Sequence, residues 1–167
     1  SGSSGATIRN SVLWSNNLNG ILIQDRSIGE GSASSSLNLI NNVIWGSRNA
    51  VQLTGQSSLS SYNNLFQANS TAGRVYLLSA GQKNIVSDYN AFFRENNAFI
   101  AERQEPGLDV QYFTRLAEWQ ADLTNDVHSL SHDPLVADAL AGDFHLQSAG
   151  RRFLPNGGFT NDADGVY

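Results

Sequence analysis

Four segments of this chain repeat one another, and a polar loop then leads each of them into a second short apolar run. Each segment begins with a polar pair that is mostly Asn, at positions 10–14, 41–45, 63–67 and 89–93. The later runs lie at 21–23, 51–53, 75–77 and 99–101. The second residue of each pair recurs at steps of 31, 22 and 26 positions. A strand-rich unit that recurs at such intervals predicts a solenoid.

Apolar residues alternate with polar ones before each pair, which is the spacing of a β-strand with one face turned inward. The inward position five residues upstream of the pair's second residue holds Ala6, Leu37, Leu59 and Ile85. A second strand after the pair turns inward Leu13, Ile44, Phe66 and Phe92. A third strand turns inward Ile21, Val51, Val75 and Phe99, and two residues later Ile23, Leu53, Leu77 and Ala101. Three short strands per turn predict an all-β fold, a right-handed parallel β-helix of about four to five rungs.

The polar pair marks a corner between the first two strands of each turn. Asn tolerates the left-handed backbone conformation that a short corner requires, and its amide can bond the same amide one rung above. We therefore expect Asn42, Asn64 and Asn90 to be buried at one corner, with their side-chain amides in mutual contact.

The chain has 167 residues, a charged fraction of 15% and a net charge of −5. The negative balance argues against nucleic acid as a partner, because phosphate binding needs a basic stripe. No apolar run approaches the length of a membrane span, so membrane insertion is not expected. The absence of cysteine removes disulfides and thiolate metal sites.

The predicted organisation has four parts. Residues 1–5 read as a linker or cloning remnant, 6–105 as the rungs, 106–148 as a C-terminal cap with a short helix around Leu116 and Trp119, and 149–167 as an irregular tail. The cap covers one end of the stack, while the N-terminal end has no cover. Bare strand edges invite association, so we expect another polypeptide or a second copy to meet that end.

The repeats resemble the pectin-lyase-like superfamily of right-handed parallel β-helices. The tail segments 116–120, 126–130, 133–135 and 142–146 are similar to the closing region of many secreted bacterial β-helix proteins. The resemblance implies a secreted or cell-surface location and a module of a larger protein with a carbohydrate-binding or scaffolding role. The alternatives are a polysaccharide lyase or glycoside hydrolase fragment with an incomplete active site, and a structural adhesin or assembly module.

In such proteins the substrate groove commonly lies over the third strand. The expected outward residues are Leu22, Gln24, Gln52, Thr54, Tyr76, Leu78, Ile100 and Glu102. This row has one carboxylate, whereas hydrolysis by the usual route needs two, and β-elimination needs a base and a cation that neutralises the uronate. The candidates for catalysis are Lys83, Glu102 and Arg103, and whether this chain is an enzyme is left open.

Aromatic residues supply candidates for carbohydrate binding. Trp14, Trp45 and Phe93 follow the inward position of the second strand and are expected to point outward, where indole faces can stack on sugars. Tyr76 is the aromatic candidate on the third strand.

No cofactor is expected, with calcium as the open alternative. Asp162 and Asp164 suggest half of a calcium loop, but no Glu follows at the bidentate position. His128 and His132 are four residues apart, yet the intervening sequence and Pro134 argue against the helix that would bring them together.

Overall fold

The computed structural model describes residues 4–24, 35–79, 84–104, 107–146, 151–153 and 159–161. The chain divides into two compact units, Ser1–His132 and Asp133–Tyr167. Most of the described residues lie in strands and one short helix is present, which confirms the all-β class expected from the sequence. The boundary between the units falls inside the segment 106–148 that the sequence predicts as one cap.

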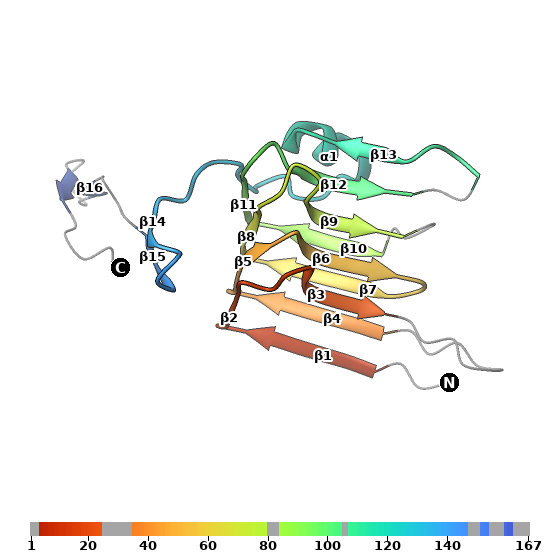
Figure 1. Ribbon diagram of the computed structural model, residues 1–167, viewed down its shortest axis with the longest axis horizontal. Helices are drawn as coiled ribbons and strands as arrows, with labels where there is room; N and C mark the ends of the chain where they lie inside the picture. The colour runs from red at the N-terminus through yellow and green to blue at the C-terminus, as the bar shows by residue number, and fades with distance from the viewer. Residues whose placement is uncertain are drawn as a thin grey trace. The chain divides into compact units, whose positions relative to one another are not determined.

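Three sheets form the first unit, and successive strands of the chain belong to different sheets (Figure 1). The first sheet contains β1 (Ser4–Arg9), β4 (Ser35–Ile40), β7 (Ser58–Tyr62) and β10 (Ile85–Asp88). The second contains β2 (Val12–Trp14), β5 (Val43–Ser47), β8 (Leu65–Ala68) and β11 (Ala91–Arg94). The third contains β3 (Asn19–Gln24), β6 (Asn49–Thr54), β9 (Arg74–Leu78), β12 (Phe99–Arg103) and β13 (Gln111–Phe113).

The strands of each sheet pair in parallel, except that β13 runs antiparallel to β12. Each set of three consecutive strands, one per sheet, is a rung. Rungs stack at the spacing of neighbouring strands, about 4.8 Å. A sharp corner joins the first and second sheets, where the φ angles of Asn10, Asn41, Asn63 and Tyr89 are 52°, 56°, 55° and 57°. Asn adopts this left-handed conformation more readily than most residues, which explains its recurrence there.

The core lies between the three sheets. The inward residues of the second sheet are those that the sequence predicts, and Ile44, Phe66 and Phe92 are fully buried. Phe66 and Phe92 stack with their ring centroids 5.8 Å apart, and Tyr76 of β9 meets both rings edge-on. Burying each such side chain contributes about 1.5–3 kcal/mol.

The register of the third sheet differs from the predicted one in its last two rungs. Val51 of β6 pairs with Tyr76 of β9, and Tyr76 pairs with Ala101 of β12. The sequence instead predicts that Val51 is followed by Val75 and Phe99 in the same row. In β9 and β12 two consecutive residues are buried, Val75 with Tyr76 and Ile100 with Ala101, and this interrupts the period of two. As a result, the predicted outward residues Tyr76, Leu78 and Ile100 are instead fully buried, and the predicted inward residue Leu77 is only half-buried.

One end of the stack is covered by β13, by α1 (Leu116–Leu123) and by the segment 125–130 (Figure 1). Trp119 of α1 is fully buried, and its ring lies 5.4 Å from that of Phe113 and 5.7 Å from that of Tyr76. No helix among the described residues is long and apolar enough to cross a membrane.

The second unit contains two antiparallel pairs of short strands. β14 (Val136–Asp138) pairs with β15 (Asp143–Leu146), and β16 (Arg151–Phe153) pairs with β17 (Phe159–Asn161). The last pair lies in the segment 149–167, which the sequence predicts as an irregular tail. Strands of three residues are too short to show an alternation in the sequence.

Candidate functional site

The outward positions of the third sheet form two rows that we call the third-sheet face. They follow from the pairing register. The first row consists of Asn19, Asn49, Arg74 and Phe99, of which Asn49 is buried, and the second consists of Leu22, Gln52, Leu77 and Glu102. Hydrogen bonds and an ion pair link the rows. Asn49 Nδ2 donates to Asn19 Oδ1 (2.9 Å), and Asn19 Nδ2 donates to Gln52 Oε1 (2.8 Å). The rungs therefore hold this polar surface in a fixed arrangement.

An aromatic and charged cluster occupies one end of the third-sheet face. The rings of Phe99 and Tyr112 have centroids 4.9 Å apart, and the guanidinium carbon of Arg74 lies 5.8 Å and 6.0 Å from them. Arg74 also forms an ion pair with Glu102. Because Tyr112 is 50% exposed, its ring is available to a ligand, while the ion-paired side chains of Arg74 and Glu102 beside it are 13% and 15% exposed.

The structure separates the candidates for catalysis. Glu102 belongs to the third-sheet face, whereas Arg103 is buried and points away from it. Arg103 forms an ion pair with Asp122 of α1, and its Nη2 donates to Gln111 Oε1 (2.7 Å) and to Asp122 Oδ1 (3.0 Å). Arg103 thus attaches the helix to the last rung. Lys83 lies outside the described residues.

The aromatic candidates of the second sheet do not form the predicted exposed platform. Trp14 is 43% exposed, but Trp45, which pairs with it one rung on, is 6% exposed and is part of the buried set. Phe93 is half-buried, with its ring centroid 5.5 Å from that of Trp45. Tyr76 lies inside the core. A β-bulge between Ile44 and Ser47 displaces this part of β5 from the regular register, which simple alternation does not anticipate.

The Asn row lies where the sequence predicts it. Asn42, Asn64 and Asn90 are each 2% exposed. Asn42 Nδ2 donates to Asn64 Oδ1 (3.0 Å), and Asn64 Nδ2 donates to Asn90 Oδ1 (3.1 Å). Each amide also donates to a strand carbonyl of the preceding rung, those of Ile8, Leu39 and Ser61. The row is a structural element that joins the rungs.

A buried carboxylate ends this row. Asp126 is fully buried, and its Oδ1 accepts hydrogen bonds from Asn90 Nδ2 (3.1 Å), Ser87 Oγ (2.9 Å) and Ser129 Oγ (2.7 Å). Its Oδ2 accepts one from Trp119 Nε1 (2.9 Å). Four donors on one carboxylate satisfy a buried charge without a cation. Sequence reasoning missed this role, although the spacing of Asp126 and Ser129 repeats that of Ser87 and Asn90.

The same network fixes the protonation of the central tyrosine. Burial raises the pKa of Tyr76 well above its usual value, and the charge of Asp126 raises it further. The Tyr76 hydroxyl lies 3.0 Å from Ser87 Oγ and 3.3 Å from Ser61 Oγ, and these hydrogen bonds lower the pKa by less than burial raises it.

His128 lies at the surface beside the last corner. Its Nδ1 is 2.7 Å from Asp88 Oδ2, and its ring stacks on Tyr89 with centroids 4.8 Å apart. Partial desolvation raises the pKa of Asp88, but hydrogen bonds from the side chain and backbone of His128 outweigh it, and the net pKa is lowered. No group of three or more His, Cys, Asp or Glu side chains in the described part of the chain is placed to hold a metal ion. Asp162 and Asp164 lie outside that part.

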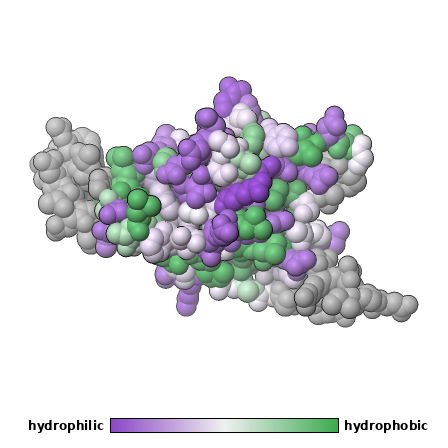
Figure 2. Space-filling model, viewed as in Figure 1, coloured by the Kyte–Doolittle hydropathy of each residue, from purple (hydrophilic) through white to green (hydrophobic). Residues whose placement is uncertain are grey.

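Comparisons with protein-family models, with curated proteins and with solved structures found no match to this chain. The geometry of the third-sheet face is therefore the feature of the molecule that bears on function. Polar and apolar residues are interspersed over the surface seen in Figure 2.

Proposed function

We propose that this chain is a right-handed parallel β-helix module, similar to the pectin-lyase-like superfamily, that belongs to a secreted or cell-surface protein and binds polysaccharide along its third-sheet face. The rotation of successive strands through three parallel sheets supports the β-helix. The Asn row at one corner supports the likeness to that superfamily. Carbohydrate binding is supported by the side chains that the face presents.

The observation that carries the proposal is the cluster of Arg74, Phe99, Glu102 and Tyr112. Sugar rings present apolar CH faces and polar rims, and a half-exposed tyrosine ring flanked by charged hydrogen-bonding groups complements both. The amides of Gln52 and Asn19 continue the polar surface along the same sheet. A chain of sugars lying across the rungs can therefore meet an aromatic ring at one end and amides further along.

The proposal is tested by titrating neutral and acidic oligosaccharides against the protein and its Tyr112→Ala variant in calorimetry. We expect Tyr112→Ala to weaken binding by about tenfold, which corresponds to about 1.4 kcal/mol. Tyr89→Ala is the matched control, since Tyr89 is 56% exposed and lies at the corner between the first and second sheets. Equal losses in the two variants, or no binding by the unaltered protein to any glycan, would refute the proposal.

One observation favours the catalytic alternative. Arg74 is a cation next to the carboxylate Glu102 on the proposed binding face, and β-elimination uses a cation with a base. Their ion pair argues against this role, because Glu102 already neutralises the guanidinium. We expect no unsaturated product, seen by its ultraviolet absorbance, from uronate polymers with or without calcium. Product formation that is lost in Glu102→Gln would replace the binding proposal with a lyase.

A further inference from the structure

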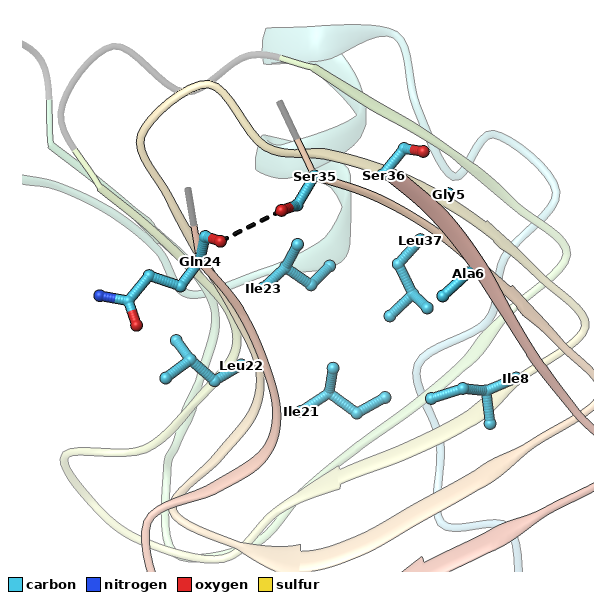
Figure 3. Close-up of a pocket in the computed structure, with 10 residues that line it drawn as sticks. All are labelled: Gly5, Ala6, Ile8, Ile21, Leu22, Ile23, Gln24, Ser35, Ser36 and Leu37. Carbon is cyan, nitrogen blue, oxygen red and sulfur yellow. Dashed lines mark hydrogen bonds between the residues drawn. The ribbon is translucent and has the colours of Figure 1, made fainter. Parts of the chain in front are cut away.

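The second row of the third-sheet face alternates between apolar and polar side chains from one strand to the next. The pairing of β12 with β13 extends this row by one strand, so that its members in strand order are Leu22, Gln52, Leu77, Glu102 and Tyr112. Figure 3 shows the outward direction on β3, where the buried Ile21 and Ile23 face the first sheet and the exposed Leu22 lies on the other side of the strand.

The alternation has a fixed spacing. Neighbouring strands of a sheet are about 4.8 Å apart, so side chains of one kind recur along this row every two strands, at roughly 10 Å. Leu77 on β9 and Tyr112 on β13 are separated in this way, with Glu102 on β12 between them. In an extended β-1,4-linked glycan each pyranose ring is flipped relative to the previous one, so the chain repeats every second sugar. One such sugar is about as long as the spacing of neighbouring strands, and the two repeats therefore match.

The charges of the face are paired with each other. Among the residues of the two rows, Arg74 is the one cation and Glu102 the one carboxylate, and both side chains are largely buried. Nε and Nη2 of Arg74 both contact Oε2 of Glu102. Oε1 of Glu102 can therefore accept a hydrogen bond from a sugar hydroxyl. A neutral sugar can be bound here without separating the ion pair.

A uronate carboxylate has no comparable place on this face. At Arg74 it would lie beside the carboxylate of Glu102, and like charges in close contact repel each other strongly. Moving Glu102 aside would leave a largely buried carboxylate without its partner. The net charge of −5 also lowers the concentration of a polyanion near the protein surface.

The amides further along the face donate in one direction. Asn49 Nδ2 donates to Asn19 Oδ1, and Asn19 Nδ2 donates to Gln52 Oε1. This series of hydrogen bonds ends at Gln52, whose Nε2 has no acceptor within the described part of the chain. Nε2 is therefore available to donate to a hydroxyl or ring oxygen of a bound sugar.

We propose that the ligand of the third-sheet face is a neutral, extended β-1,4-linked polysaccharide and not a uronate polymer. This inference rests on the proposed function and specifies its ligand. The glycan lies across the strands, and its sugars contact Leu22, Leu77 and Tyr112 at every second strand. Between these contacts its hydroxyls form hydrogen bonds with Gln52 and Glu102.

The first test compares hexasaccharides by calorimetry with the full chain. The β-1,4-linked set consists of the neutral hexamers of glucose, xylose, mannose and N-acetylglucosamine, and the alternatives are maltohexaose, which is neutral and α-linked, and hexagalacturonate, which is acidic. We expect at least one of the β-linked hexamers to bind at least about tenfold more tightly than either alternative. Equal or tighter binding of an alternative would overturn this inference and leave glycan binding standing, whereas binding of none of these glycans would refute both.

The second test changes the charge of the face. Glu102→Gln keeps the shape of the side chain and removes the negative charge beside Arg74. We expect the affinity for hexagalacturonate, divided by that for the tightest β-linked hexamer, to increase at least about tenfold, because the guanidinium is no longer neutralised. Asp88→Asn is the matched control, since Asp88 belongs to the first sheet and pairs with His128. An unchanged ratio in Glu102→Gln, or an equal change in Asp88→Asn, would contradict the inference, since a merely structural effect weakens both ligands alike.

Discussion

Replacing Asn64 by alanine removes the central amide of the Asn row. In the native protein Asn64 Nδ2 donates to Leu39 O, Ser61 Oγ and Asn90 Oδ1, at 3.0, 3.1 and 3.1 Å. Its Oδ1 accepts from the backbone N–H and the side-chain Nδ2 of Asn42, at 2.9 and 3.0 Å. The substitution therefore affects groups on two neighbouring rungs.

The magnitude follows from which groups keep another partner. Asn42 Nδ2 still donates to Ile8 O, and Asn90 Oδ1 still accepts the backbone N–H of Asn64. The backbone N–H of Asn42 loses its acceptor at a buried corner, which costs about 1–3 kcal/mol. The hydrogen bonds lost by the other groups add about 1 kcal/mol in net terms. We expect the free energy of unfolding to fall by about 2–4 kcal/mol.

The assay is urea denaturation followed by tryptophan fluorescence, with the slope of the transition used to check that cooperativity is kept. Asn38→Ala is the matched control, because Asn38 is exposed and its side chain makes one long hydrogen bond, to Thr7 Oγ1 (3.4 Å). We expect that control to stay within about 0.5 kcal/mol of the native protein. If Asn64→Ala cost no more than Asn38→Ala, with equal slopes, the Asn row would not be a source of stability.

Two further predictions concern the capped end. The pKa of Asp88 is lowered in the folded protein, so its pairing with His128 stabilises the protein at pH values above the unfolded pKa of about 4. This contribution is lost as the pH falls through the lower pKa of the folded state. The stability difference between the native protein and His128→Ala should thus shrink on acidification, and a constant difference in urea midpoints would contradict this. Arg103→Met should lower the free energy of unfolding by about 2 kcal/mol. The loss stays moderate because the side chain of Asp122 is one-quarter exposed and can be hydrated again. Glycan binding should stay unchanged. Loss of binding without loss of stability would instead assign Arg103 to the ligand site.

The corner and the second sheet could be predicted from the sequence because little chain separates them. Two residues join the first and second strands of each rung, so the polar pair fixes the inward position that follows. Phe66 and Phe92 lie at equal distances from Asn64 and Asn90, and they pair in the structure. Short connections with fixed geometry leave the register no freedom.

The third sheet could not be predicted in full because the loops before it vary in length and its strands turn two adjacent residues inward. In the run from Val75 to Leu78 every residue is apolar, so alternation does not indicate which of them face the core. The cluster on the third-sheet face was missed for a related reason. Tyr112 reaches Phe99 through the antiparallel strand β13, whose pairing leaves no trace in the repeat.

Asp126 shows how the Asn row sets the polarity of the whole stack. Each amide donates toward the C-terminal end, from Asn42 to Asn64 and from Asn64 to Asn90, so the last amide donates to an acceptor outside the row. Asp126 is that acceptor, and Ser129 Oγ takes the backbone N–H of Asn90 (2.8 Å), the role that an Asn oxygen has in earlier rungs.

At this end every donor of the row is satisfied, and no amide is left to receive a further rung. At the other end Ser11 replaces the Asn: its N–H donates to Asn42 Oδ1 and its hydroxyl donates back to Arg9 O, so this corner is satisfied as well. The polar chemistry of the corner therefore closes the stack at the cap.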